Sequence, residues 1–313
     1  MRKVITIGEL LIDFMPMEKG FRLKDTEGFV KKPGGAPANV AVAAAKLGRD
    51  AYFIGQVGQD GFGDFLKSSL EAYGVNTSRL YQTSKAKTAL AFVSLDDRGE
   101  RDFIFYRNPS ADQLLEKDGI NLDDFKNEIL HFCSVSLDDY PIKETHKYVI
   151  RTLKQKGTII SFDPNLRFSL FSDLMAYRKN ILEFIPYADI LKISEDELEF
   201  ITTFKDEKKA VEMLLKFPLK YLIITRGSEG ASLFTKSKRY DVGGVEVDAI
   251  DMTGAGDAFI GAFLAKIALD EITDKNEDEK IIEYLNFANK VAALTTTKLG
   301  AMNAIPYLDE INI

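Results

Sequence analysis

The 313-residue sequence predicts an α/β fold in which a central, mostly parallel sheet carries helices on both faces. From about residue 120 onward, short apolar segments alternate with helix-like segments, which is typical of a parallel sheet with crossover helices. Residues 88–107 depart from this alternation, because two strand-like segments flank a polar turn, and they predict a β-hairpin.

The elements follow from short apolar runs that end at glycine or polar residues. Strands are expected near residues 4–7, 51–54, 131–135, 158–162, 190–193, 221–225 and 231–234, with a strand-like segment at 244–248. The hairpin strands are 89–95 and 101–107, around a turn at 96–99. Helices are expected near 40–47, 64–73, 143–156, 195–202, 206–216, 258–264 and 280–297.

Composition narrows the function classes. Hydrophobic residues make up 45% and charged residues 28%, which allows a sizeable core, and the net charge of −7 argues against a nucleic-acid surface. The single cysteine, Cys133, excludes an internal disulfide and fits a reducing compartment, so a cytoplasmic location is expected. No stretch of 18 apolar residues predicts a membrane span.

Residues 251–257, Asp-Met-Thr-Gly-Ala-Gly-Asp, predict an anion-binding turn before an apolar helix. Backbone N–H groups and the helix dipole would face a bound anion there, and a phosphate could approach Gly254, Ala255 and Gly256 closely. The turn is not a Walker A loop, because no Lys follows a Gly in it. It is not a dinucleotide fingerprint either, because Phe259 stands where that motif has its third Gly.

Asp257 closes this turn and has two interpretations. Asp is a preferred helix-capping residue, so a structural cap is the simpler one. A carboxylate beside a phosphate site also suits a general base, which accepts the proton of the nucleophile in phosphoryl transfer.

Polar residues follow several predicted strands. Asp13 lies just beyond the first strand, and the segments 163–167, 194–197 and 225–227 follow three later ones. Because ligands bind beyond the carboxyl ends of parallel strands, these segments predict one shared site.

The chain resembles the ribokinase-like (PfkB) carbohydrate kinases over essentially its full length. The pair Gly34-Gly35 with Asn39, the glycine-rich loop 55–63 and the turn 251–257 look like the two signature regions of that family. Met252 departs from the pattern, because the family usually has Thr there, and we expect little effect on catalysis.

Within the family, segments 34–39, 101–112, 162–167 and 192–198 look most like fructokinases. The resemblance implies a single ribokinase-like domain over residues 1–313. It also implies a lid sheet formed by about residues 13–33 and 88–107. Such a lid would exclude water, which competes with the sugar as phosphoryl acceptor.

The resemblance further implies ATP-dependent phosphorylation of a sugar hydroxyl, with the 6-hydroxyl of D-fructose as the expected acceptor. Asp257 would be the base, and Gly254, Ala255 and Gly256 would stabilise charge on the transferring phosphoryl group. The matched sugar-binding positions are Asp13, Gly34, Gly35, Asn39, Arg107, Asn165 and Arg167. The matched nucleotide-binding positions are Lys192, Ser194, Thr225, Gly227 and Asn289.

Two ions are implied in the same way. Glu197 would help to organise Mg²⁺, largely through waters, although Ser194 replaces the Asn of the family motif. A monovalent cation, expected to be K⁺, would be held by backbone carbonyls near Asp251, Thr253, Thr295, Lys298 and Gly300.

Several alternatives stay open. A 2-keto-3-deoxygluconate kinase could use Arg107 and Arg167 to clamp a substrate carboxylate, whereas surface ion pairing is the simpler interpretation of both arginines. Asn39 could be a cap or lie in solvent, and Glu197 could simply belong to an acidic first helical turn. The chain could also be a catalytically silent sugar-binding protein. A homodimer through the lid sheet is a further hypothesis, because the strand 101–107 is bulky on both faces.

Overall fold

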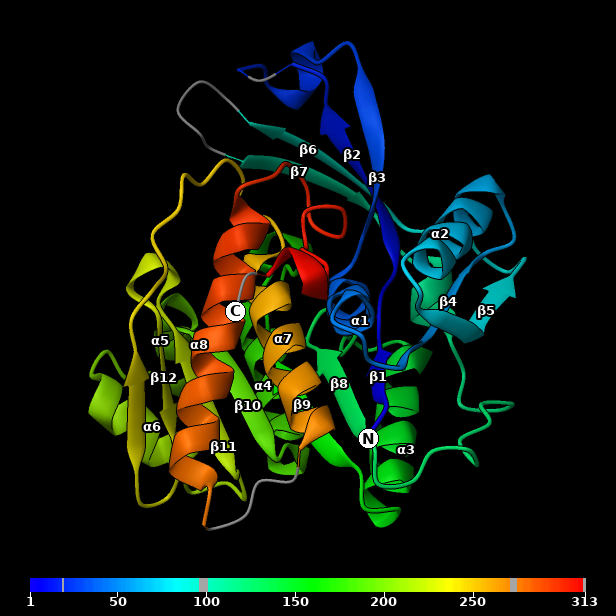
Figure 1. Cartoon of the computed structure of the whole chain (residues 1–313). Coiled ribbons are helices and arrows are strands. Elements are labelled where there is room, and N and C mark those ends of the chain that lie inside the picture. Colours follow the sequence, from blue (N-terminus) through cyan, green and yellow to red (C-terminus); the bar gives the residue numbers. More distant parts are fainter. Residues whose placement is uncertain (19, 96–100, 271–274, 312–313) are drawn as a thin grey trace.

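The computed structural model describes residues 1–18, 20–95, 101–270 and 275–311. A large sheet flanked by helices forms the body of the molecule, and a smaller sheet projects from the end where helix α7 begins (Figure 1). The predicted α/β class with a hairpin outside the main sheet is confirmed. The predicted hairpin turn at 96–99 lies outside the described residues. No helix in the described part of the chain is long and apolar enough to cross a membrane.

Nine strands form the main sheet within the described residues. In spatial order they are β13 (Arg239–Val242), β12 (Ala231–Phe234), β11 (Tyr221–Thr225), β10 (Ile190–Ser194), β9 (Ile159–Asp163), β8 (Ile129–Cys133), β1 (Val4–Ile7), β4 (Ala51–Gly58) and β5 (Asn76–Thr83). The strands from β11 to β5 pair in parallel, and β12 pairs antiparallel with both β11 and β13. The carboxyl ends of the parallel strands therefore share one edge.

Helices cover both faces because side chains alternate along each strand. On β11, Tyr221 and Ile223 join one core while Leu222 and Ile224 join the other. The helices that supply the first core are α1 (Ala36–Lys46), α2 (Gly61–Ala72), α7 (Ala255–Leu269) and α8 (Glu277–Thr296). Those that supply the second are α3 (Pro141–Gln155), α4 (Leu174–Phe184), α5 (Glu195–Thr202) and α6 (Glu207–Leu214).

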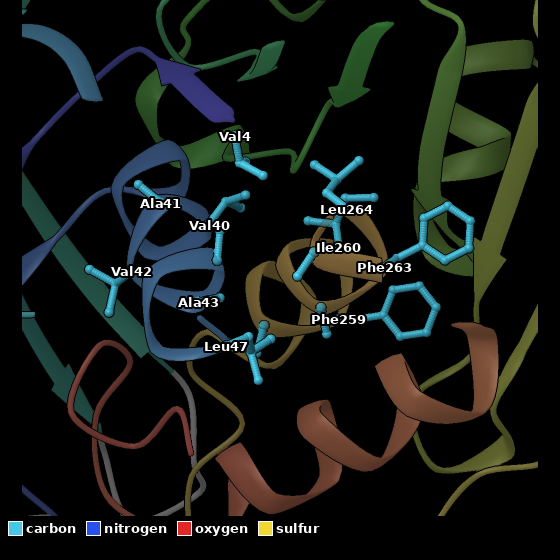
Figure 2. Close-up of a cluster of buried hydrophobic side chains, with 14 of the residues drawn as sticks. Val4, Val40, Ala41, Val42, Ala43, Leu47, Phe259, Ile260, Phe263 and Leu264 are labelled. Atoms are coloured by element: carbon cyan, nitrogen blue, oxygen red, sulfur yellow. The ribbon is translucent and has the colours of Figure 1, made fainter. Parts of the chain in front are cut away.

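Helices α1 and α7 pack side by side over the first core, where small and branched apolar side chains interlock (Figure 2). A Cβ atom at Gly261 would lie 2.5 Å from the Cβ of Ala43, so only glycine permits this approach. The close contact fixes the second turn of α7 against α1, which positions both helices for the site.

The small sheet contains β3 (Phe29–Gly34), β2 (Leu11–Pro16), β6 (Leu90–Leu95) and β7 (Arg101–Tyr106), in that spatial order. Strand β2 follows β1 almost directly, so the small sheet is joined to the carboxyl edge of the main sheet. One of its faces carries Asp13 next to Gly34, and the opposite face carries the half-exposed Ile104 and Tyr106.

Several sequence predictions need correction. Residues 244–248 alternate in polarity but form no strand, because they pair with no neighbour and instead line a cavity. The predicted loop 55–63 is reduced to residues 59–60, since β4 continues to Gly58 and α2 begins at Gly61. The sequence reading also missed β5, β13 and α4, whose mixed polar and apolar composition reflects their position on the outside of the fold.

Candidate active site

The turn before α7 has the backbone geometry of an anion-binding site. Gly254 occupies the N-cap position with a φ of +79°, and a Cβ there would lie 2.8 Å from the Cβ of Ala301. Only glycine accepts both conditions easily. No side chain caps the helix, and the Ala255 N–H makes only a long 3.3 Å bond to the Met252 carbonyl. The first-turn N–H groups are thus left for a ligand.

Asp257 lies in the first turn of α7, with 4% of its surface exposed. Its carboxylate accepts one hydrogen bond from Nδ2 of Asn39 at 2.7 Å and one from Nδ2 of Asn165 at 2.6 Å. Burial raises the pKa of Asp257, against the lowering effects of the Asn39 bond and of the charges on Arg167 and Lys192. The capping interpretation is therefore wrong for Asp257, and Asn39 is neither a cap nor in solvent.

A buried ion pair lies beside this carboxylate. Nζ of Lys192 is 2.9 Å from Oδ2 of Asp163, and the two side chains are 6% and 0% exposed. The same Nζ is 3.1 Å from the position that a Cβ would take at Gly256, so the ammonium is next to the glycine turn. Burial raises the pKa of Asp163 to about 7, although Lys192 opposes the shift. For Lys192, burial acts downward, but the carboxylates around it raise its pKa overall.

A cavity of about 650 Å³ opens from the glycine turn. Its lining includes the predicted nucleotide-binding residues Thr225, Gly227 and Asn289, together with Met252 and residues 244–247 and 249. The Asn289 side chain donates to the Gly243 carbonyl at 2.8 Å and so holds that wall in place. The volume lies in the range of small-molecule and cofactor pockets. Ser194 does not line the cavity, but it is next to Thr225 in the sheet register.

The predicted sugar-binding residues meet on the other side of Asp257. A Cβ at Gly34 would collide with the Asp13 carboxylate, and one at Gly35 would collide with the Glu9 carbonyl. Burial raises the pKa of Asp13 to about 7, and the charge of Arg167 opposes this. Arg167 also acts on Asp257, so its guanidinium is near both carboxylates.

The contacts of Arg107 differ from both sequence interpretations, which were a substrate-binding arginine and a surface ion pair. Its Nε and Nη2 donate to Oδ2 of Asp112 at 2.9 and 2.6 Å, and its Nη1 donates to the Val135 carbonyl at 3.2 Å. With 5% of its side chain exposed, the pair is buried, so surface ion pairing is wrong for Arg107. Its contact with a sugar stays a prediction.

Glu197 forms a capping box at the start of α5. One carboxylate oxygen accepts from the Ser194 N–H at 2.8 Å, and the other accepts from the Leu166 N–H at 2.6 Å. The interpretation as part of an acidic first turn is confirmed. Within the described residues, no group of three or more His, Cys, Asp or Glu side chains could hold a metal ion. The role of Glu197 toward magnesium stays a prediction.

The residues predicted to hold a monovalent cation do come together. The Ile250 N–H donates to the Thr296 carbonyl at 2.7 Å, which joins the turn to the end of α8. The Asp251 carboxylate accepts from the N–H groups of Thr253 at 3.0 Å and Gly300 at 2.8 Å. Thr295 and Lys298 belong to the same end of α8, where Lys298 pairs with Glu310 at 3.4 Å.

Sequence reasoning missed the buried carboxylate Glu9, and it placed Asp163 in the predicted site segment 163–167 without assigning it a role. Glu9 is 2% exposed and accepts hydrogen bonds from the Ala36 N–H at 3.2 Å and from the Ser136 hydroxyl at 3.0 Å. It thereby anchors the start of α1, the helix that carries Asn39. An acidic residue at or just beyond the end of a buried strand was the available signal for both.

Comparison with known proteins agrees with this geometry. The model of the pfkB family of carbohydrate kinases matches residues 1–308. A protein described as probable fructokinase-4 from Arabidopsis thaliana is 42% identical over 310 residues, which is 98% of this chain and 95% of that protein.

Two solved structures extend the comparison. A fructokinase double mutant from Vibrio cholerae O395, bound to fructose, ADP and a potassium ion, is 34% identical with a TM-score of 0.88, covering 98% of this chain and 96% of that one. A putative ribokinase II from E. coli, in complex with ATP and Mg²⁺, is 31% identical with a TM-score of 0.87, covering 99% and 97%.

Proposed function

This chain belongs to the pfkB family of carbohydrate kinases, and from this premise we propose that it is an ATP-dependent fructokinase acting on the 6-hydroxyl of D-fructose. The observation that carries the proposal is the position of Asp257. Its buried carboxylate lies in the first turn of α7, between a glycine turn without a capping side chain and the Asp13 side of the site. A base beside an anion site is what phosphoryl transfer to an alcohol requires.

Arg107, whose side chain is bonded to Asp112, is assigned a supporting role in the sugar site. Direct sugar binding is assigned to Asp13, Gly34, Gly35, Asn39, Asn165 and Arg167. Asp13 offers acceptors to sugar hydroxyls. Among the described residues, Oδ1 of Asn39 is buried without a hydrogen-bond partner. A buried acceptor left unpaired is costly, and a sugar hydroxyl would satisfy it.

In the proposed reaction, Asp257 accepts the proton of the 6-hydroxyl while the bond between that oxygen and the γ-phosphorus forms. The bond from the γ-phosphorus to the bridging oxygen breaks, and ADP leaves. The raised pKa of Asp257 makes it a better proton acceptor than an ordinary carboxylate. The Gly254–Gly256 turn and the Lys192 ammonium would stabilise the charge on the transferring group.

The nucleotide would occupy the 650 Å³ cavity, with Thr225 and Gly227 toward the phosphates and ribose and Asn289 beside the base. Ser194 would support Thr225, its neighbour in the sheet register. A divalent ion, proposed to be Mg²⁺, would neutralise part of the phosphate charge. Both oxygens of Glu197 already accept backbone N–H groups, so contact through water fits better than direct ligation. The joined loops around Asp251 and Gly300 support a K⁺ site built from carbonyls.

The small sheet is proposed to act as the lid of the single domain 1–313. Its outward face leaves Ile104 46% and Tyr106 61% exposed, which supports a homodimer through this sheet. We expect Tyr106→Glu to yield monomers in sedimentation at micromolar concentration, while the equally polar change Met175→Glu elsewhere on the surface keeps the dimer. A monomeric parent protein would contradict the dimer. A cytoplasmic location also stays a proposal, supported by the single buried Cys133.

The 2-keto-3-deoxygluconate alternative is weakened by the geometry. Three donor groups of Arg107 are already bonded to Asp112 and Val135, so the two-arginine clamp loses one member. A silent sugar-binding protein would not need a buried carboxylate beside a free helix N-terminus.

The test is ATP-dependent ADP release, with Mg²⁺ and K⁺, against fructose, ribose, glucose, 2-keto-3-deoxygluconate and fructose 6-phosphate. Turnover that strongly favours fructose supports the proposal. Turnover on another sugar would keep the kinase and remove the substrate assignment. No turnover on any of them would favour the silent protein.

A further inference from the structure

The side chain of Asp163 lies between two groups of residues that would act on the phosphoryl group. Asp163 is the last residue of β9, and none of its side chain is exposed. Its Oδ2 faces the Lys192 ammonium at 2.9 Å, and its Oδ1 accepts the Asn165 N–H at 3.1 Å. One carboxylate thus touches both sides of the site.

On the phosphate side, the carboxylate determines where the Lys192 charge is held. A lysine has a long, flexible side chain, so its position depends on its partner. With Asp163 as that partner, Nζ of Lys192 lies next to Gly256 in the glycine turn. Asp163 forms the ion pair with this ammonium at 2.9 Å, whereas Glu197 and Asp257 act on it only through their charges.

On the base side, the carboxylate shapes the turn that carries Asn165. Asn165 has a φ of +47°, a left-handed conformation that the local hydrogen bond from its N–H to the Asp163 side chain supports. From this conformation Nδ2 of Asn165 donates to Oδ1 of Asp257 at 2.6 Å. The orientation of the base therefore depends on the same carboxylate.

We propose that Asp163 is a positioning residue for phosphoryl transfer, which fixes the Lys192 ammonium beside the glycine turn and the Asn165 amide on the base. The inference rests on the proposed function and adds to it a residue that couples the phosphate side to the proton-accepting side. Asp163 acts through its neighbours and touches neither substrate.

The chain contains a matched control at the opposite end of the same strands. Asp189 accepts the Ile160 N–H at 2.8 Å and pairs with Lys154 at 3.2 Å, so it has the same kinds of contact. It precedes β10, whereas Asp163 ends β9, and it is far from the glycine turn along the strand direction. If such carboxylates had only a structural role, substitution of Asp163 and substitution of Asp189 would have similar effects.

The experiment compares Asp163→Asn with Asp189→Asn by kcat and by the KM values for fructose and ATP. Asparagine keeps an oxygen for the Asn165 N–H but removes the charge that holds Lys192. We expect kcat to fall about 10- to 100-fold in Asp163→Asn, with the fructose KM within about threefold of the parent value, because a misplaced group slows the reaction more than it weakens binding. Asp189→Asn should keep kcat within about twofold. Equal effects of the two substitutions would overturn the inference.

A double-mutant cycle with Lys192→Met tests the proposed route. If Asp163 acts through Lys192, adding Asp163→Asn to Lys192→Met should change kcat by less than about threefold. Independent, multiplicative losses would contradict it. The double variant also removes both buried charges together, so it should fold even if a single variant does not. A double variant with parental kcat would equally overturn the inference.

Failure of the inference can be separated from failure of the proposed function by measuring Asp257→Asn alongside. An inactive Asp257→Asn with a fully active Asp163→Asn would remove only the role of Asp163. Full turnover in Asp257→Asn would remove the base itself.

Discussion

Helices α5 and α7 both begin at the carboxyl edge of the main sheet, yet their first turns are built for different purposes. At α5, Ser194 and Glu197 form a capping box that occupies the helix N-terminus. At α7, the N-cap is Gly254, no side chain caps the helix, and the acidic residue of the first turn bonds to Asn39 and Asn165. Both segments place an acid in the first turn, so local pattern alone does not distinguish a cap from a base.

The contrast teaches that a phosphate site is recognised by the N–H groups a helix leaves unused. Helix α2 behaves like α5, because Asp60 accepts from the N–H groups of Phe62 and Gly63. In α7 the side-chain amides of Asn39 and Asn165 instead turn Asp257 away from its own backbone.

The largest effect is expected for Asp257→Asn. It removes the proton acceptor while keeping a similar shape, so kcat should fall by about 10³-fold, within the range measured for general bases. Binding of fructose and ADP, measured by calorimetry, should change little. Asp196→Asn is the matched change in the first turn of α5 and should leave kcat unaltered. A kcat within tenfold of the parent for Asp257→Asn would break the contrast.

Gly254→Ala should produce the next effect. The positive φ and the contact with Ala301 force the turn to shift, so the N–H groups no longer point at the phosphoryl group. We expect kcat/KM for ATP to fall about 10²-fold, comparable to the loss of an oxyanion-hole donor. Gly61→Ala, at the first residue of α2, meets no atom within 4 Å and should be silent. Similar rates for both variants would argue against a role for the turn.

Proton concentration should affect the sugar side of the site. The pKa of Asp13 is raised to about 7, so this carboxyl gains a proton in the folded protein as pH falls below 7. The ionised form is the better acceptor for hydroxyls, so the fructose KM should rise as pH falls, by up to about tenfold per unit below pH 6. Asp13→Asn should raise the KM and flatten this dependence. If the fructose KM of Asp13→Asn still depended on pH, a group other than Asp13 would be responsible for that dependence.

The protonation of Asp13 that weakens fructose binding at low pH has the opposite effect on folding, because it stabilises the folded protein. Between pH 4 and 7 the folded protein binds more protons at this site than the unfolded chain, because the folded pKa is the higher one. The contribution of Asp13 to the free energy of unfolding therefore decreases as pH rises through this window.

The smallest effect is expected at α5. Glu197→Ala removes the capping box and the bond to the Leu166 N–H, so the free energy of unfolding should fall by about 1–2 kcal/mol in urea titrations. Asp60→Ala, which uncaps α2, should cost a similar amount without changing kcat. A Glu197→Ala variant that also needs much more Mg²⁺ for half-maximal activity would support the proposed magnesium role.

Much of the site was predictable because its residues are consecutive or follow strands. The turn 251–257 and Asp13 could be recognised from small residues and strand ends alone, whereas the pair Gly34-Gly35 was assigned to the site by the family resemblance. The partners of Asp257 could not, because Asn39 and Asn165 are 218 and 92 residues away in sequence. Arg107 looked like a ligand or a surface charge until the fold buried it against Asp112.

The sequence by itself determined the α/β class, most of the parallel strands and the glycine turn, because these depend on local periodicity and on residues without side chains. Tertiary structure decided which acid is a base. Asp257, Glu197 and Asp60 all stand at the start of a helix, and only the contacts of the folded chain assign Asp257 to two side-chain amides and the others to backbone N–H groups. The physical reason is that the role of a carboxylate depends on its burial and on the donors around it, and distant segments supply both.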